Sequence, residues 1–404
     1  MSDGRALRIT VIGFKTIESL SFELRPLTVL IGPPGSGKSN LLEAVAAAGL
    51  VGRMYLMHAV LEDASVCGVP GPRRREPEIG SLLRFEDVFQ LYPWLDYRKP
   101  AVVEVKPVAA DAATVTARLQ PSKASMRRLD VSLEASWSGR KAGIVAEYEP
   151  GTAASCPVNF FGSSPLPRGQ SVREVLGKAP VALLYSFERY GLNTQFEDML
   201  ECKDCGVGTL LYETGINLPR VLSRAPYVLR RFNEWLREEL ETPLEARVLT
   251  RKPELVFFNY DLEVPPRVLS DTLLRVLYYY TAVATASRLA RAARQGIVLL
   301  LEEPEARAFP YSFDLLADAI GDAVESGVYV VMTTHNPMLV SRLLDAVPEE
   351  GLALLYVRSV EGYTRLHKLS LERLAESLVT VGDLMVMSPS EVVERFAEEE
   401  QGKG

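Results

Sequence analysis

The feature that most constrains this chain is the stretch LIGPPGSGKSNLLEA, residues 30–44. The apolar run LTVLI comes before it and predicts a buried strand, and SNLLEAVAAA follows with a helical pattern rich in Leu and Ala. Between them stands G-x-x-x-x-G-K-S, in which glycines let backbone N–H groups curl closely around a phosphate. The order of strand, glycine-rich loop and helix predicts a P-loop of the Walker A type.

Each residue type in this loop has a chemical reason to be there. The Lys38 ammonium is expected to reach the β- and γ-phosphates of a nucleotide, and the Ser39 hydroxyl to hold Mg²⁺. An ordinary glycine-rich turn is the alternative, and the pattern arises by chance in roughly one chain in a hundred of this length. We expect the phosphates to bind Gly32, Pro33, Pro34, Gly35, Ser36, Gly37, Lys38, Ser39 and Asn40.

Two later apolar stretches end in polar residues that suit the same chemistry. In the stretch VLLLEEPEARAFP a predicted strand ends in Glu302 and Glu303, which is a Walker B pattern. The first acid can hold Mg²⁺ and the second can accept a proton from an attacking water. VVMTTHNP ends another strand in His335, which can donate to γ-phosphate oxygens. A solvated acidic turn and an isolated histidine are the alternatives; the preceding P-loop favours a catalytic set of Lys38, Glu303 and His335.

Composition bounds the class of protein. The chain has 404 residues, 47% hydrophobic and 24% charged, which indicates a soluble globular protein of two or three domains. The first residues carry no apolar signal region, no stretch spans a membrane, and four cysteines without a secretory signal indicate a reducing cytoplasm. The net charge of −7 gives no overall attraction to DNA or to anionic lipid, so only local basic patches could bind them.

The order of the predicted elements indicates an α/β fold. Strands alternate with helices from about residue 254 onward, which is typical of a mostly parallel, helix-covered sheet. We therefore expect one discontinuous ATPase domain, residues 1–50 and 255–404, interrupted by a long α+β insert over residues 51–254. The insert reads as β-rich over about 101–165 and helical over about 170–250.

A third stretch carries a family resemblance. PPRVLSDTLLRVLYYY stands between the P-loop and the two acidic and histidine motifs. This ordered set resembles the ABC-type ATPases of the SMC/RecF/OLD group, as does the opening IGFKTIESLSFELRPLTVLIGPPGSGKSNLLEA. YETGINLPRVL is similar to a stretch of small members of that group. The resemblance covers both ends of the chain well and the insert poorly.

The resemblance implies an ATP-dependent dimer that hydrolyses ATP to ADP and phosphate. Two heads pair head to tail with two ATP molecules between them, and Ser270 opens a signature helix that contacts the γ-phosphate of the opposite subunit. Glu302 then supports Mg²⁺, Glu303 polarises water and His335 is the switch residue. Thr272 stands where the group has Gly, so a weaker or differently built contact between subunits is expected. Without the resemblance, LSD is an ordinary helix N-cap.

The resemblance also implies a role on DNA in repair, recombination or defence. The alternatives are a nucleotide-gated regulator of a partner effector that binds no DNA, and the ATP-binding subunit of a transporter, against which the large insert argues. Only residues 336–404 follow His335, which is too few for the nuclease domain of OLD-type proteins. We therefore expect any nuclease or effector to be a separate chain.

Several weaker signals have equally simple alternatives. Cys202 and Cys205 form half of a zinc site, with Cys67 and Cys156 elsewhere in the chain, but free thiols in a loop are the simpler interpretation. Gln90 is a candidate for the glutamine of a Q-loop. Clustered arginines could contact a phosphate backbone or simply favour a helix end: Arg288, Arg291, Arg294, Arg230, Arg231, Arg127, Arg128 and Arg73 to Arg75.

Overall fold

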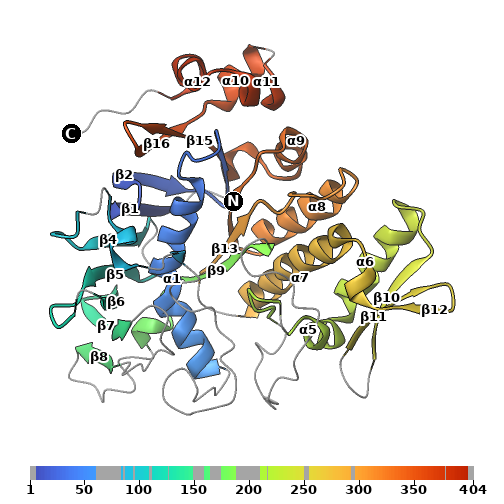
Figure 1. Ribbon diagram of the computed structural model, residues 1–404, viewed down its shortest axis with the longest axis horizontal. Coiled ribbons are helices and arrows are strands. Elements are labelled where there is room, and N and C mark those ends of the chain that lie inside the picture. The colour runs from blue at the N-terminus through green and yellow to red at the C-terminus, as the bar shows by residue number, and fades with distance from the viewer. Residues whose placement is uncertain are drawn as a thin grey trace.

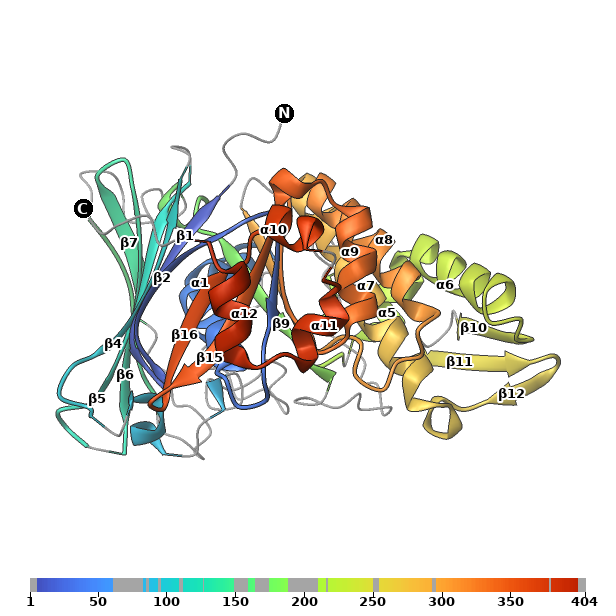
Figure 2. The same ribbon diagram turned by 90° about the horizontal axis from the view of Figure 1, so that it is seen from above.

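The computed structural model shows two large β-sheets with a long helix between them, then a layer of helices and a smaller three-stranded sheet (Figure 1). Figure 2 shows these layers in order, from the antiparallel sheet at one end to a small β-hairpin sheet at the other. The structure describes residues 6–60, 83–84, 87–93, 96–108, 112–125, 127–148, 159–163, 174–187, 210–215, 217–249, 254–292, 296–377 and 379–398.

The central sheet has six strands in the order β16-β15-β3-β14-β13-β9. All neighbours pair in parallel except β15 and β16, which pair antiparallel at one edge. The predicted strands before the P-loop, the acidic pair and His335 are confirmed as β3, β13 and β14. The strands are β3 (Leu27–Ile31), β9 (Val181–Tyr185), β13 (Ile297–Glu302), β14 (Tyr329–Thr333), β15 (Leu352–Val360) and β16 (Tyr363–Lys368).

Strands β3, β9, β13 and β14 of this sheet are mainly apolar because helices cover both faces. In β13, Leu299 and Leu301 belong to one hydrophobic core, whereas Val298 and Leu300 belong to the other. Helix α1 (Lys38–Val60) covers one face, and α7 (Asp271–Ala292) and α8 (Ser312–Glu325) cover the opposite face. α9 (Pro337–Ala346) packs against α8.

The second sheet has seven strands and is antiparallel throughout, in the order β2-β1-β4-β5-β6-β7-β8. Its buried side chains alternate along each strand, as in β5, where Val115, Ala117 and Leu119 enter the core shared with α1. The strands are β1 (Leu7–Phe14), β2 (Ile17–Leu24), β4 (Ala101–Pro107), β5 (Thr114–Pro121), β6 (Leu129–Trp137), β7 (Arg140–Tyr148) and β8 (Asn159–Ser163).

This sheet corrects the expected fold class. A mostly parallel sheet describes the six strands around the P-loop, but the larger sheet is antiparallel, so the fold is mixed α/β. Strands β1 and β2 belong to this antiparallel sheet and not to the P-loop sheet. They form a hairpin, and β1 pairs with β4, because their alternating polar and apolar residues suit a sheet with one solvated face.

Strand pairing also crosses the domain boundaries that the sequence suggested. β1, from the expected ATPase domain, pairs with β4 from the expected insert, and β9 of the expected insert pairs with β13. Helix α1 runs through residue 50 without a break. The strand pairing therefore does not follow the predicted division into residues 1–50 with 255–404 and residues 51–254. That division stays a prediction.

The remaining elements surround these layers. A helical lobe with a three-stranded antiparallel sheet lies beyond α7, and a group of short helices follows β16 (Figures 1 and 2). In the part of the chain that is described, no helix combines the length and apolar character of a membrane span. The bounds are α5 (Leu218–Arg224), α6 (Pro226–Glu238), β10 (Leu244–Leu249), β11 (Glu254–Asn259), β12 (Leu262–Val264), α10 (Leu371–Glu376), α11 (Val381–Val386) and α12 (Pro389–Phe396), with 3₁₀ turns η2 (Val88–Leu91), η4 (Pro266–Val268) and η5 (Glu349–Gly351).

Candidate functional site

The predicted site residues follow three adjacent parallel strands. The P-loop follows β3, Glu302 ends β13 with Glu303 directly after it, and His335 follows β14. Because the carboxyl ends of parallel strands meet at one edge of a sheet, all three segments come together there. The structure thus places the P-loop, the acidic pair and His335 at one edge.

The P-loop contains two glycines that no other residue could replace without strain. Gly32 has φ +142° and Gly37 has φ +98°, a region that side chains disfavour. A Cβ on Gly32 would lie 2.0 Å from the Val357 carbonyl oxygen of β15, and one on Gly37 would lie 2.0 Å from the Thr364 hydroxyl of β16. Both backbone conformation and close packing against β15 and β16 therefore require glycine.

Lys38 lies against the inside of this loop. Its Nζ donates to the carbonyl oxygens of Gly32 and Pro33, both at 2.9 Å. Burial lowers the pKa of the ammonium to about 8, while the nearby charges of Glu303 and Glu305 act in the opposite direction. A lysine so placed changes charge readily when an anion approaches it.

Asn40 differs from the other loop residues because its side chain is used within the protein. Its Nδ2 donates to the Thr16 hydroxyl at 2.7 Å, and Thr16 shares a hydrogen bond of 2.7 Å with the Thr364 hydroxyl. These contacts join the turn between β1 and β2 to the start of α1 and to β16. The antiparallel sheet therefore holds the P-loop from one side.

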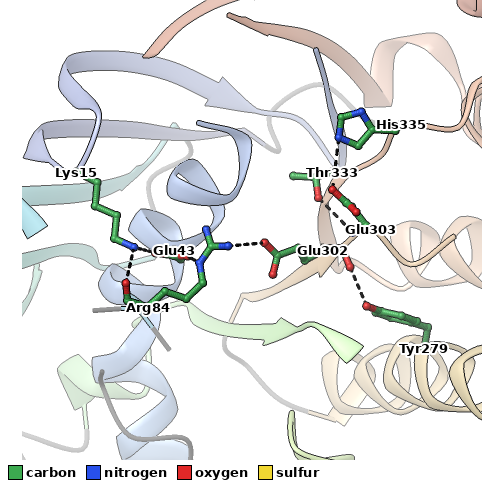
Figure 3. Close-up of polar contacts among 8 residues, drawn as sticks. All are labelled: Lys15, Glu43, Arg84, Tyr279, Glu302, Glu303, Thr333 and His335. Atoms are coloured by element: carbon green, nitrogen blue, oxygen red, sulfur yellow. Dashed lines mark hydrogen bonds and ion pairs between the residues drawn. The ribbon is translucent and has the colours of Figure 1, made fainter. Parts of the chain in front are cut away.

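Glu303 and His335 form the central polar pair of the site (Figure 3). His335 Nε2 lies 3.4 Å from Glu303 Oε1, and a hydrogen bond from His335 lowers the pKa of the Glu303 carboxyl. Glu303 has φ +44°, rare for a residue with a side chain. Its N–H donates to the Thr333 carbonyl at 3.1 Å and hydroxyl at 3.2 Å, which stabilises this conformation. The structure therefore holds an ionised carboxylate next to His335.

Glu302 is anchored from two sides. Its carbonyl accepts a hydrogen bond of 2.8 Å from the Tyr279 hydroxyl of α7, and its carboxylate lies 3.7 Å from Arg84 Nη1 (Figure 3). Arg84 also pairs with Glu43 of α1, which is fully buried and accepts from Lys15 as well. A chain of charges thus runs from the antiparallel sheet to Glu302.

Sequence reasoning missed Glu43 and Arg84. The one signal for Glu43 was a lone acid within the apolar run LLEAVAAA, since a charge at such a position is almost never fully buried unless it is paired. Arg84 gave no signal, because it lies 41 residues further along the chain than Glu43, with which it pairs.

The start of α7 shows what Thr272 does. Its N–H donates to the Ser270 hydroxyl at 3.3 Å, as in a helix N-cap, and its own hydroxyl donates to the Arg307 carbonyl at 2.8 Å. Arg307 in turn lies 3.7 Å from Asp271. The helix start is therefore tied to the loop that follows the acidic pair. Ser270 lies nine residues before Tyr279, roughly 14 Å along the helix.

Other candidates are placed away from this group or cannot be placed. The Gln90 side chain accepts from the Asp87 N–H at 3.4 Å in a capping box of η2. Cys202, Cys205, Cys67, Cys156, Arg73 to Arg75 and Arg294 lie outside the described residues. Among the residues that are described, no group of three or more His, Cys, Asp and Glu side chains is arranged for a metal ion.

Comparisons with known proteins give a partial family match and distant structural similarity. The family described as "Protein of unknown function (DUF2813)" matches residues 6–56. No curated protein matches the sequence.

Three solved structures of SMC head domains are similar to this chain. One, bound to the C-winged helix domain of ScpA, is 14% identical with a TM-score of 0.45, covering 91% of this chain and 98% of that chain. The SMC head domain from Thermotoga maritima is 12% identical with a TM-score of 0.37, covering 91% and 100%. The head from Pyrococcus furiosus, with an extended coiled coil and bound to the C-terminal domain of ScpA, is 13% identical with a TM-score of 0.46, covering 92% and 98%.

At 12–14% identity and TM-scores of 0.37–0.46, these similarities carry no argument about function. The narrower resemblance to RecF and OLD proteins stays a prediction.

The Thr272 contact gives a first prediction. Thr272→Val removes the hydroxyl at constant shape and should destabilise the protein by about 1 kcal/mol, the usual contribution of a neutral hydrogen bond. Thr272→Ser keeps the hydroxyl and should stay within about 0.5 kcal/mol of wild type. Urea unfolding of the three proteins measures this, and equal midpoints for all three would contradict it.

Proposed function

We propose that this protein binds ATP with Mg²⁺ at the edge formed by β3, β13 and β14 and hydrolyses it to ADP and phosphate. The observation that carries the proposal is an ionised carboxylate, Glu303, held beside His335 and within electrostatic reach of the P-loop Lys38. A phosphate-binding cation and a base next to one another are the two groups that phosphoryl transfer to water requires.

The residues of the loop fit a nucleotide. The backbone at Gly32 and Gly37 leaves no room for a side chain, so N–H groups can approach phosphate oxygens closely. The Ser36 hydroxyl is buried and has no hydrogen-bond partner among the described residues, although buried hydroxyls nearly always have one. We propose residues 32–40, together with the N-terminus of α1, as the phosphate-binding segment.

The proposed metal ligands are Ser39 and Glu302. Mg²⁺ prefers hydroxyl, carboxylate and water oxygens, and when bound it neutralises charge on the phosphate oxygens. Ser39 lies in the first turn of α1 and Glu302 ends β13, so both residues lie at the proposed substrate edge. Arg84 lies close to the Glu302 carboxylate and would orient it toward that position.

The protein's own residues then account for the chemistry. The Glu303 carboxylate accepts a proton from the water whose oxygen attacks the γ-phosphorus, and the bond to the ADP oxygen breaks. Lys38 and the N-terminus of α1 stabilise the charge that develops on the phosphate oxygens. His335 holds Glu303 through its Nε2, and in the form with protons on both ring nitrogens its Nδ1–H can also donate to a γ-phosphate oxygen.

We further propose that ATP joins two copies of the chain. Ser270 directly precedes α7, and the helix start is fixed by Thr272 and Arg307, so the partial positive charge of the helix N-terminus is held in one place. A second copy would present this end to the open side of the γ-phosphate. Hydrolysis would release the two copies because the γ-phosphate contacts are lost.

The dimer can be tested with a variant that binds ATP without consuming it. Glu303→Gln keeps the shape of the side chain but cannot accept the proton, so it should accumulate as a dimer with Mg-ATP. Adding Ser270→Arg should keep that variant monomeric through bulk at the interface, whereas the exposed Ser223→Arg should not. Light scattering measures all three; a Glu303→Gln protein saturated with ATP yet monomeric at micromolar concentration rules out the proposed dimer.

Lys38 gives a prediction about protons. Its pKa of about 8 means that the free protein has lost most of this charge at pH 9, whereas bound phosphate favours the charged form. ATP binding should therefore take up roughly half a proton more at pH 9 than at pH 7.5. Calorimetry in buffers of different ionisation enthalpy measures this uptake. Equal uptake at both pH values, or unchanged ATP affinity in Lys38→Ala, would contradict the assignment.

DNA is the second candidate partner, with regulation of a separate effector as the alternative. Tyr227 of α6 is 41% exposed, and its hydroxyl donates to the Ala284 carbonyl of α7 at 3.3 Å. Burial raises the pKa of its phenol while the nearby Arg288 and Arg291 lower it. An exposed ring beside two cations suits a nucleic-acid strand, which binds through phosphate contacts and base stacking.

The DNA candidate predicts binding that weakens steeply with salt, by roughly 0.7–0.9 in log K per log salt for each phosphate contact. Arg288→Glu should weaken it further, whereas Arg358→Glu, on β15, should not. Anisotropy of labelled single- and double-stranded DNA with Mg-ATP measures both. An absence of binding at low salt favours the regulatory function.

A further inference from the structure

Glu305 is a buried carboxyl that the proposed chemistry does not use directly. It lies two residues after Glu303, and only 7% of the residue is exposed. Its Oε1 accepts two hydrogen bonds from the segment after β14, one from the Thr334 hydroxyl at 2.6 Å and one from the His335 N–H at 2.9 Å. A side chain from the β13 loop therefore holds the backbone of the residue that pairs with Glu303.

This contact has a counterpart in the opposite direction. The Glu303 N–H donates to Thr333, on the strand before His335, while the His335 N–H donates to Glu305, on the loop after Glu303. Each member of the Glu303–His335 pair is thus fixed by a residue from the other strand's end. The two crossed contacts set the position of both side chains, which lie 3.4 Å apart.

The contact extends into α9. The Thr334 hydroxyl accepts from the Asn336 N–H at 3.0 Å, and Asn336 Oδ1 in turn caps α9 by accepting from the Met338 N–H at 2.9 Å. Glu305 is therefore the buried end of a short hydrogen-bonded chain that leads to a helix start. His335 lies within this chain, so its backbone has little freedom while Glu305 stays in place.

Burying a carboxyl at this position is unfavourable for stability unless the carboxyl makes contacts that a smaller side chain could not make. Burial raises the pKa of the Glu305 carboxyl, with the Glu303 charge acting in the same direction. Its Oε2 has no hydrogen-bond partner among the described residues. The favourable contacts of the Glu305 carboxyl are the two hydrogen bonds that Oε1 accepts, one from Thr334 and one from His335.

We propose that Glu305 is a positioning residue for ATP hydrolysis, which holds the His335 backbone so that its imidazole stays in register with Glu303. The proposal rests on the proposed function. Glu305 acts as a hydrogen-bond acceptor and touches neither the nucleotide nor the attacking water. An amide oxygen at the same place can therefore replace it, whereas a methyl group cannot.

The kinetic test uses Glu305→Ala, Glu305→Gln and Thr334→Val, with the exposed Glu376→Ala as control. Glu305→Ala should lower kcat by roughly 10- to 100-fold with KM for ATP within about threefold of wild type, because displacement of a catalytic pair acts on the transition state. Glu305→Gln should recover kcat to within about threefold of wild type. Thr334→Val should fall between them, since the His335 contact remains.

A spectroscopic readout tests the contact without any turnover. The chain has three histidines, so ¹⁵N-histidine labelling gives three amide signals, and His335→Gln assigns the one from residue 335. An N–H bonded to a carboxyl oxygen resonates at low field because the hydrogen bond is strong. That signal should move upfield in Glu305→Ala and shift little in Glu305→Gln.

The outcomes separate the two proposals. A wild-type protein without ATPase activity overturns the proposed function, whereas an active wild type with equal kcat in Glu305→Ala overturns only the role of Glu305. A Glu305→Gln protein as slow as Glu305→Ala also overturns it, because the charge rather than the acceptor would then matter. If Glu305→Ala does not fold, an unchanged kcat in Thr334→Val together with a slow Glu305→Gln overturns it.

Discussion

The parallel pairing of β3, β14 and β13 is the constraint on which the site depends. The register sets Glu302 opposite Thr333 and Thr333 opposite Leu30, so the three strands end at one level. Because side chains alternate along a strand, a slip of one residue would turn each terminal side chain to the opposite face. The backbone hydrogen bonds of the sheet therefore decide on which face of the sheet each terminal side chain lies.

A second constraint is the burial of Glu43 between the two sheets. A fully buried carboxylate is strongly unfavourable unless cations and hydrogen bonds compensate it, and here Lys15 and Arg84 both do so. Lys15 comes from the turn between β1 and β2, and Arg84 also lies beside Glu302. The antiparallel sheet is thus part of the site's support, because the turn between its strands β1 and β2 supplies Lys15 as a partner of Glu43.

Much of the site could be predicted from the sequence because its signals are local. Apolar strands that end in Glu302, Glu303 or His335 and a glycine loop ahead of a helix are patterns of a few residues each. The antiparallel sheet could not be predicted in the same way, because β1 pairs with β4 almost a hundred residues later. Contacts such as Glu305 with Thr334 and Thr272 with Arg307 depend on how loops meet, about which residue type and spacing say nothing.

The left-handed backbone at Glu303 has a consequence for how this position can change over evolutionary time. At φ +44° the fold would favour glycine or asparagine, which adopt this region most readily, whereas the proposed hydrolysis requires a side chain that can accept a proton. Fold and chemistry therefore select for different residues at position 303. Under the proposed function, a descendant that kept this architecture but had given up hydrolysis would gain stability by exchanging the glutamate, so the identity of residue 303 in related chains would record whether their chemistry is still under selection.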